Sequence, residues 1–438
     1  MKRYSAYKDS GIEWIGEIPE DWSVTALNKV AQVIDPEPSH RAPSMVSDGG
    51  MPYVGIRDLN KDGSINVDTC RMISESSIKA QEMRFTKEKG DIVFCRVATL
   101  GNPVMLNKYR MRFSLSATLC LIKTDSSQVV SRYIYYYLDS LPIKLQSDLF
   151  STGSTRKSLG METIRKFKVH MPSLNEQLTI ATYLDQQTAK IDAAIEKKER
   201  IIEQLKEYRQ SLITETVTRG LDPETSMKDS GIEWIGEIPK GWEVKKLKHL
   251  VKRRAKNASK KDADLPYIGL EHIKGGTGEL VRNKEESTDE SGETSILFKE
   301  GDVLFGKLRP YLAKVYNPKL SGKCSSEFLV LDSHSLSSTY LQNVLLSNDF
   351  IQLVNSSTFG AKMPRTNWGF IGNVRFMVPS LDEQKAITDF LDQKTSQIDA
   401  VVQKNEGIIK KLREYRQSLI SEVVTGKMDV REAVEVDV

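Results

Sequence analysis

Two groups of basic residues carry the chemistry that this sequence can be expected to perform. They stand in loop-like segments or directly after short apolar runs that predict buried strands. Arginine and lysine in such positions can bind phosphate oxygens, and arginine can also donate two hydrogen bonds to one guanine. An ordinary solvated surface charge is the alternative for each of them. The basic candidates are Arg57, Arg96, Arg156 and Lys157 in the first half of the chain and Lys307, Arg309, Lys362 and Arg365 in the second. Thr99, which follows the same predicted strand as Arg96, is a further candidate.

Two of these cations stand in a loop rich in small polar residues. Residues 151–160 read STGSTRKSLG, so Gly, Ser and Thr surround Arg156 and Lys157. Small side chains and backbone N–H groups around two cations suit phosphate oxygens. A plain solvent-exposed loop would have the same composition, so both interpretations stay open.

The distribution of charge favours a polyanionic partner. The formal net charge of the chain is only +4. Residues 20–171 contain 21 Lys and Arg against 16 Asp and Glu, and residues 240–378 contain 22 against 15. The remainder is acidic, with 20 basic and 28 acidic residues. Two basic blocks on a less basic frame indicate two nucleic-acid surfaces, although an excess of this size also occurs on ordinary domains.

The sequence offers no catalytic or metal-binding motif. An adenine methyltransferase needs Asn or Asp, two prolines and an aromatic residue, and the nearest approach, Asn102-Pro103-Val104, fails at its third position. A GxxxxGK[ST] loop for nucleotide phosphates is absent. The four cysteines are scattered, at Cys70, Cys95, Cys120 and Cys324. Neither they nor the histidines have the spacing of a metal site. Without a membrane-length apolar run or an apolar leader, a cytoplasmic protein with no membrane contact is expected.

A duplicated framework must position the candidate residues. The twelve residues KDSGIEWIGEIP occur at 8–19 and again, unchanged, at 228–239. An identical repeat of this length indicates internal duplication. Each copy is followed by a block that mixes strand-like and helix-like segments. The two blocks keep the same order of motifs but share little identity.

Within the first block, apolar runs predict three strands and one buried helix. The strands are expected at 52–59, 89–97 and 113–122, and the helix at 131–138. The second block has counterparts of the strands at 266–273, 300–308 and 323–331.

Each block leads into a long helix-patterned segment. The first, 184–218, has apolar residues in steps of three, four and seven, which predicts a narrow helix–helix seam. The expected seam is Leu184, Ile191, Ala194, Ile201, Leu205, Tyr208 and Leu212. Adding 207 to each number yields the second seam: Leu391, Ile398, Val401, Ile408, Leu412, Tyr415 and Leu419. A Ser followed by Glu three residues on, at Ser173–Glu176 and Ser380–Glu383, predicts a capping box before each helix.

The two helices are expected to pair with each other in an antiparallel manner. The short link at 218–226 can join antiparallel helices but cannot run back along a helix. The predicted class is therefore α+β, with two mixed α/β domains separated by two long antiparallel coiled-coil helices and related by a pseudo-two-fold internal repeat. A 35-residue helix is roughly 50 Å long, about one to one and a half turns of B-DNA. Such a rod would hold two readers at a set spacing.

The combined motifs resemble the specificity (S) subunits of type I restriction–modification enzymes. The resemblance rests on two GIEWIGEIP…W segments, two PSLxEQ helix entries, two LDQ…IDA…EYRQSLI helices and the divergent blocks between them. It covers essentially the whole chain. It implies two target-recognition domains that read the halves of a bipartite asymmetric DNA site. It further implies that the helices dock two methyltransferase (M) subunits and, in complete enzymes, restriction (R) subunits.

The resemblance also implies boundaries and partners. The expected segments are an N-terminal connector packed near the C-terminal helix (1–19), recognition domain 1 (20–171), a central helix (172–219), a linker with the repeated connector (220–239), recognition domain 2 (240–378), a C-terminal helix (379–427) and a tail (428–438). No catalytic residue and no bound cofactor is expected on this chain. S-adenosylmethionine, ATP and magnesium would belong to partner subunits.

Two other functional classes are open to the same sequence. One is a fused methyltransferase or nuclease, which the missing catalytic motifs disfavour. The other is a coiled-coil scaffold whose globular domains bind only protein. DNA binding that weakens steeply with ionic strength would separate the leading interpretation from the scaffold.

Overall fold

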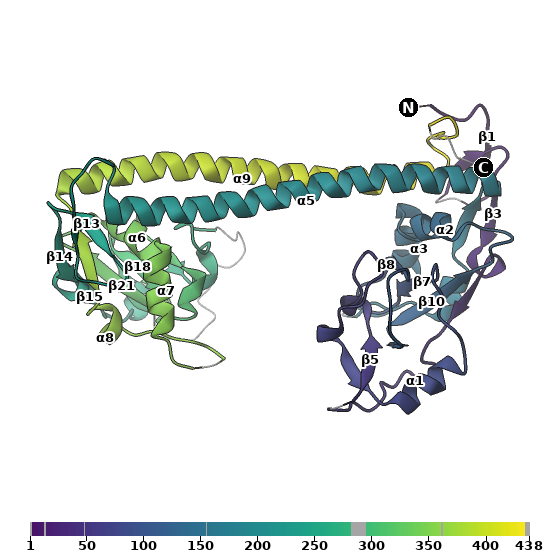
Figure 1. Ribbon diagram of the computed structural model, residues 1–438, viewed down its shortest axis with the longest axis horizontal. Coiled ribbons are helices and arrows are strands. Elements are labelled where there is room, and N and C mark those ends of the chain that lie inside the picture. The colour runs from purple at the N-terminus through teal and green to yellow at the C-terminus, as the bar shows by residue number, and fades with distance from the viewer. Residues whose placement is uncertain are drawn as a thin grey trace. The chain divides into compact units, whose positions relative to one another are not determined.

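A computed structural model describes residues 2–12, 15–47, 49–154, 156–281, 295–360 and 362–433 (Figure 1). The chain forms two compact units. The first unit comprises residues 1–197 and 407–438, and the second comprises residues 198–406. Each unit therefore contains one globular domain together with a segment of both long helices.

The first globular domain is built on small sheets. Its main sheet has the order β4 (Ala31–Ile34), β10 (Leu119–Thr124), β7 (Ile92–Cys95), β8 (Gly101–Met105). A second sheet has the order β6 (Arg71–Ile73), β5 (Met51–Val54), β9 (Ser114–Leu115), in which β5 and β9 are parallel. A third pairs β3 (Ser23–Ala26) with β11 (Lys168–Met171). Its helices are α1 (Glu75–Glu82), α2 (Ser131–Leu138), α3 (Leu141–Phe150) and α4 (Met161–Arg165).

The second globular domain repeats this topology. Its main sheet is β15 (Val251–Arg254), β21 (Phe328–Ser333), β18 (Val303–Gly306), β19 (Val315–Tyr316), and β14 (Glu243–Lys246) pairs with β22 (Arg375–Val378). A three-stranded sheet again contains one parallel pair, β16 (Tyr267–Ile268) with β20 (Gly322–Cys324), but β17 (Ile296–Phe298) joins it on the β20 side. Its helices are α6 (Ser338–Leu346), α7 (Asn348–Ser356) and α8 (Trp368–Ile371).

Each repeated connector forms a short hairpin. The first pairs β1 (Tyr7–Asp9) with β2 (Glu17–Pro19), and the second pairs β12 (Met227–Asp229) with β13 (Glu237–Pro239). In the first unit, the Tyr7 hydroxyl donates a hydrogen bond to the Gly426 carbonyl at the end of the C-terminal helix (3.0 Å).

Strand boundaries differ from the prediction at two places in each domain. The strands expected at 52–59 and 266–273 end at Val54 and Ile268, because 3₁₀ turns follow at Ile56–Asp58 and Leu270–His272. The single strand expected at 113–122 is wrong, because a turn at Ser116–Thr118 divides it into β9 and β10. Likewise, 323–331 is divided between β20 and β21. The helix expected at 131–138 is confirmed as α2, and its Tyr133, Tyr136 and Tyr137 are buried.

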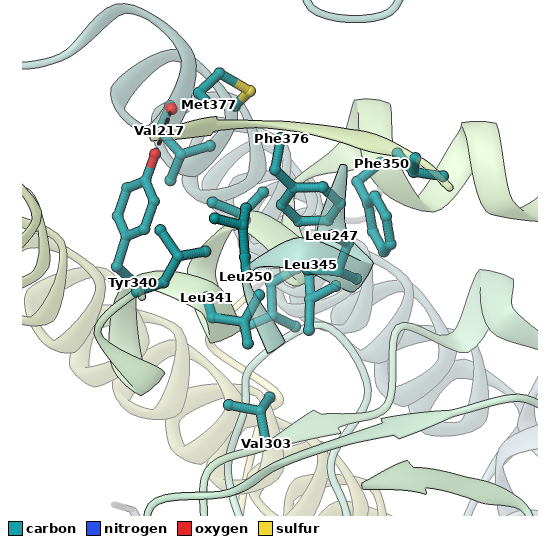
Figure 2. Packing of buried hydrophobic residues seen from close by; sticks show 14 of the residues in the cluster. Val217, Leu247, Leu250, Val303, Tyr340, Leu341, Leu345, Phe350, Phe376 and Met377 are labelled. Atoms are coloured by element: carbon teal, nitrogen blue, oxygen red, sulfur yellow. Dashed lines mark hydrogen bonds between the residues drawn. The ribbon is translucent and has the colours of Figure 1, made fainter. Parts of the chain in front are cut away.

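The core of the second unit packs the globular domain against the helix that precedes it. Tyr340, Leu341 and Leu345 of α6 belong to one cluster with Phe376 and Met377 of β22 (Figure 2). The Tyr340 hydroxyl donates to the Val217 carbonyl (3.2 Å), as Figure 2 shows.

The first unit repeats this attachment. Tyr133 of α2 holds the place of Tyr340, and Val424 is the counterpart of Val217 in the repeat. The Tyr133 hydroxyl shares its hydrogen between the carbonyls of His170 (2.8 Å) and Val424 (3.3 Å). The same tyrosine thus fixes each globular domain to the end of a long helix.

The long helices are α5 (Leu174–Arg219) and α9 (Leu381–Val424). In the first unit Asp192 of α5 pairs with Arg416 of α9, and in the second unit Arg209 of α5 pairs with Asp399 of α9. A later residue of one helix meets an earlier residue of the other, which confirms antiparallel pairing.

The two predicted capping boxes differ in completeness. The second is complete, because Glu383 N–H donates to Ser380 Oγ and the Glu383 carboxylate accepts from Ser380 N–H. In the first, Glu176 N–H donates to Ser173 Oγ (3.3 Å). The Glu176 carboxylate instead accepts from the Tyr4 hydroxyl (2.7 Å) and the Trp22 indole (3.1 Å), so it ties the N-terminal connector to the start of α5.

The phase of the predicted seam is wrong by one residue at several positions. Ala194, Ile201 and Tyr208 were expected inside, but the buried residues are Ile195, Ile202 and Arg209. The physical reason is that Arg209 takes a seam position to reach Asp399, while Tyr208 can keep its polar end in water. The second helix shows the same shift: in place of Val401, Ile408 and Tyr415, the residues closer to the interior are Val402, Ile409 and Arg416.

Candidate nucleic-acid interface

A cleft of about 590 Å³ opens on the first globular domain, beside the end of β7. One wall is the 3₁₀ turn η2 (Ile56–Asp58) that follows β5, and the other is the loop that follows β7. Three arginines from three segments line it, namely Arg57, Arg71 and Arg156. Thr99 and the small residues of the β9–β10 turn complete the lining. Sequence-distant cations therefore converge on one hollow.

The three arginines of this cleft are available to an anion. Among the residues that the structure describes, Arg57, Arg71 and Arg156 have no ion-pair partner within 4 Å, and all three are exposed. The one acidic residue of the lining, Asp58, is already engaged: its carboxylate accepts from Gly55 N–H (2.8 Å) and from the Thr69 hydroxyl (2.8 Å). The cleft thus presents three arginines without an ion-pair partner in the described chain against one carboxylate, which suits phosphate or the acceptor edge of a base.

A strained backbone shapes the loop after β7. Ala98 has a φ of +68°, a left-handed conformation that costs a residue with a Cβ about 1–3 kcal/mol. Its N–H donates to the Lys157 carbonyl (2.8 Å), so the loop at 151–160 lies directly beside the strand exit. Arg96 N–H donates to Thr118 O (2.9 Å), and Arg96 O accepts from Leu159 N–H (2.8 Å). Surrounding hydrogen bonds therefore hold the strained residue in place.

The second domain builds the same strand exit with other side chains. Arg309 takes the place of Ala98, with a φ of +50°, and its N–H donates to Pro364 O (2.8 Å). Lys307 N–H donates to Glu327 O (2.8 Å), and Lys307 O accepts from Thr366 N–H (3.1 Å). These bonds match those of Arg96 one for one. In both domains, backbone hydrogen bonds therefore join the segment after this strand to the later loop.

Three of the predicted site residues use their charge within the protein. The Arg96 side chain is buried (8% exposed) and reaches His40 Nδ1 (3.0 Å), Asp35 (3.5 Å) and the Leu159 carbonyl (3.3 Å). Arg96 thus holds the loops together and does not face solvent as a cation of an open loop would.

The other two paired residues are nearer the surface. Arg365 makes a two-pronged pair with Glu327 (3.0 and 3.2 Å), which ties the later loop to the β20–β21 turn. Lys157 pairs with Asp148 (2.8 Å) where both side chains are exposed, an interaction that phosphate can replace at little cost.

The remaining predicted residues face solvent. In the first domain these are Arg57, Thr99 and Arg156, all of which line the cleft. In the second domain Arg309 and Lys362 are exposed and Lys307 is half-buried.

Arg71 and His40 are among the cleft residues that were not predicted from the sequence. Arg71 is in β6 and lies opposite Tyr53 of β5. Local sequence patterns do not predict this pairing between separate strands. His40 has a positive φ (+53°). It stands in the segment SHRAPS, whose Ser, His and Pro mark a turn but not its place at the cleft.

Other kinds of site find little support. Within the described ranges, no group of three or more His, Cys, Asp or Glu side chains could hold a metal ion. No helix of the described chain combines the length and the apolar character needed to cross a membrane.

The family model for the type I restriction modification DNA specificity domain matches the chain twice, at residues 19–207 and 239–410. The chain belongs to this family. The two matches coincide with the two copies of the globular domain and their helices. This specificity subunit is therefore a non-catalytic component that recognises DNA sequence with two domains.

Relatives match this specificity subunit along nearly its whole length. The EcoDI specificity subunit of Escherichia coli is 21% identical, with 94% of this chain and 90% of the relative covered. The MjaIX specificity subunit of Methanocaldococcus jannaschii is 24% identical, with 95% and 96% covered. A solved structure from work on complex assembly and conformational transition of the type I R-M system aligns with a TM-score of 0.66 at 14% identity, covering 94% of this chain and 99% of its own. That structure shows a shared fold.

Removing two cations of the cleft should weaken binding to every DNA sequence by a similar factor. We expect Arg71→Gln with Arg156→Gln to reduce the slope of log affinity against log salt by about 1.8, because each phosphate contact contributes about 0.9. Titrations of duplex DNA at several salt concentrations measure this slope. The matched control is Lys89→Gln with Arg110→Gln, two exposed cations of the same domain outside the cleft lining. An unchanged slope in the double variant would place the phosphate contacts elsewhere.

Proposed function

We propose that this specificity subunit reads a bipartite, asymmetric DNA site, one half with each globular domain. The observation that supports this most directly is the shared strand exit, with matching hydrogen bonds around Ala98 and Arg309 but different side chains. The same backbone arrangement with different side chains is suited to two domains that recognise different DNA sequences. Arginine, lysine and carboxylate side chains at such positions discriminate base edges.

We further propose that α5 and α9 set the spacing between the two half-sites. Both helices run without a break, over 46 and 44 residues. A continuous helix rises by about 1.5 Å per residue, so removing residues shortens it by a known amount.

The charged outer faces of these helices are proposed to dock two adenine methyltransferase subunits, to which restriction subunits are added in the complete enzyme. S-adenosylmethionine would then be bound by the methyltransferase subunits, and ATP with magnesium by the restriction subunits. The family to which the chain belongs and the acidic balance outside the two domains support this arrangement.

Mapping methylated adenines across the host genome tests the proposal. A split motif should be present in the wild type and vanish when the gene for this chain is deleted. Exchanging residues 20–171 for those of another specificity subunit should change one half of the motif only. A change in both halves would refute separate reading by the two domains.

Deleting one heptad from each long helix tests the spacing. We expect the gap between the half-sites to shorten by about three base pairs, because seven helical residues span roughly 10 Å and B-DNA rises about 3.4 Å per base pair. The half-site sequences themselves should stay the same. A deletion protein that methylates the original motif with its original gap would contradict the role of the helices.

One alternative is a scaffold that binds only protein. Failure of the chain, together with its methyltransferase partner, to bind any DNA at low salt would favour it. The three arginines of the cleft, which have no ion pair within the described ranges, argue against this alternative.

A further inference from the structure

A one-turn 3₁₀ helix occupies the same place in both globular domains. In the first domain η2 (Ile56–Asp58) follows β5, and in the second η6 (Leu270–His272) follows β16. Each is preceded by a glycine whose N–H donates to the last side chain of the turn: Gly55 to Asp58 Oδ2 (2.8 Å) and Gly269 to His272 Nδ1 (3.1 Å). The backbone frame of the turn is therefore shared.

The hydrogen bonds after the turn are shared as well. The carbonyl of Asp58 accepts from Asn66 N–H (2.8 Å), and that of His272 accepts from Val281 N–H (2.7 Å). The middle residue of the turn is nevertheless Arg57 in the first domain and Glu271 in the second. An equal frame thus presents opposite charges.

Both turns lie beside the strand exit that carries the candidate interface. Arg57 lines the cleft together with Thr99 and Arg156. In the second domain, a Cβ added to Gly306, the last residue of β18, would come within 2.9 Å of Leu270 in η6. Lys314 fixes this turn further, since its ammonium donates to the Leu270 carbonyl (2.7 Å) and to the Ile273 carbonyl (3.0 Å). The middle residue of each turn is thus held near the residues that follow β7 or β18.

Both middle side chains are open to a ligand. Arg57 is exposed and makes no ion pair within the described ranges. The Glu271 side chain is 59% exposed, and within the described chain the one ring or ammonium nitrogen within 4 Å of its carboxylate belongs to the adjacent His272 (3.6 Å). Hydrogen bonds from the glycine N–H groups and from Lys314 hold the backbone of these turns, and they involve neither the Arg57 nor the Glu271 side chain.

The opposite charges argue against a phosphate contact at this position. Phosphate contacts are independent of sequence, so two domains on the same DNA backbone would keep a cation there. A carboxylate next to a phosphate is repelled, whereas a carboxylate next to a base edge can accept a hydrogen bond. The contrast between Arg57 and Glu271 is what two base readers of different specificity require.

We infer that this position determines specificity in both domains, with Arg57 reading a guanine and Glu271 reading a cytosine. The Arg57 guanidinium would donate two hydrogen bonds to guanine O6 and N7 in the major groove. The Glu271 carboxylate would accept a hydrogen bond from the cytosine N4 amino group. This inference rests on the proposed function, in which each domain reads its own half-site.

Single-base competition measurements test the inference. The chain is purified with its methyltransferase subunits, its target is taken from the genome map, and every base pair of both half-sites is varied in turn. Arg57→Gln should reduce the preference for one guanine in one half about 10- to 100-fold, and favour adenine there, because glutamine pairs with adenine N6 and N7. Glu271→Gln should reduce the preference for one cytosine in the other half-site by a similar factor.

The controls are exposed residues of the same charge in the same domains, Arg110→Gln and Glu300→Gln, which should leave every preference unchanged. The inference is overturned if Arg57→Gln and Glu271→Gln leave all single-base preferences intact. It is also overturned if Arg57→Gln weakens all sequences equally and lowers the salt slope, as a phosphate contact would. A wild-type complex without any split target would instead refute the proposed function itself, before a variant is made.

Discussion

Replacing Arg209 by methionine is expected to destabilise the second unit by about 3–5 kcal/mol, the usual cost of removing one partner from a buried ion pair. The Arg209 side chain is only 9% exposed, and that of its partner Asp399 is 16% exposed. Their closest atoms, Arg209 Nε and an Asp399 carboxylate oxygen, are 3.1 Å apart. Methionine retains the apolar length of the side chain but leaves the Asp399 carboxylate without its countercharge.

The same substitution should also release part of the globular domain. The Arg209 guanidinium donates to the Gly276 carbonyl (2.8 Å) and to the Thr277 carbonyl (3.3 Å), in a loop that follows η6. One side chain therefore joins α5, α9 and the recognition domain of the second unit. Hydrogen exchange should accelerate roughly 100-fold or more in α5 near residue 209 and in the loop at 274–279, since about 1.4 kcal/mol corresponds to a factor of ten.

The matched control for Arg209 is Lys206→Met on the same helix. Within the described chain, Lys206 pairs with Glu203, and both side chains are exposed, so its loss should cost less than about 1 kcal/mol. In the first unit, Arg416→Met should destabilise in the same direction but by less, because Arg416 joins Asp139, which lies between α2 and α3, to Asp192 of α5, whose side chain is 44% exposed. Exchange rates of Arg209→Met within threefold of wild type would show that the buried pair contributes nothing net.

Replacing His170 by methionine should make the free energy of unfolding of the first unit depend less on pH between pH 7 and pH 5. His170 is 1% exposed, and burial lowers its pKa from 6.5 to about 4, with the Val424 carbonyl opposing the shift and the ammonium of Lys427 adding to it. Between these pH values the unfolded chain binds a proton that the folded chain does not, so stability falls as pH falls. The contribution of His170 to the free energy of unfolding should therefore decrease by roughly 2 kcal/mol as the pH falls from 7 to 5.

Among the residues that the structure describes, no acidic side chain stabilises a proton on His170. Its ring lies near Trp22 and Tyr137, at centroid distances of 6.4 and 5.4 Å. The hydroxyl of Tyr133 is committed to backbone carbonyls, one of which is that of His170 itself (2.8 Å). Neither the indole nor a neutral phenol can compensate a positive imidazolium in the core.

The second domain shows why methionine is a suitable replacement for His170. Met377 stands at the same place in the second domain: His170 lies opposite Val24 in one strand pair, and Met377 lies opposite Val244 in the other. Met377 is fully buried, so methionine suits this environment. The measurement is chemical denaturation of wild type and His170→Met between pH 7 and pH 5. Equal pH dependence in the two proteins would contradict the assigned role of His170.

In the long helices, periodicity predicted the existence of each helix but not every buried position. Their existence, their repeat and the seam positions Leu184 and Ile191 were evident from spacing. The phase beyond Ile191 was not, because an apolar pattern alone ranks Tyr208 above Arg209. The seam instead takes the arginine, because Asp399 and two carbonyls are there to satisfy it.

The candidate interface shows a different limit. Loop composition and strand order indicated Arg57, Thr99 and Arg156, and the structure brings these three together in one cleft. The same reasoning ranked Arg96 with them, although its side chain is buried. Arg71 was missed, since only the pairing of β5 with β6 brings it there. Exposure and pairing depend on residues distant in the chain, which local patterns do not report.

The sequence alone determined that this specificity subunit is an internal duplication with two unlike domains and two long paired helices. Repeats and helical periodicity are local properties, so they can be read directly from the order of residues. Tertiary structure decided which cations remain free and which are consumed by neighbours. It also showed that Arg57 and Glu271 occupy the same position in equivalent turns of the two domains. That equivalence follows from the matching backbone hydrogen bonds and not from residue identity.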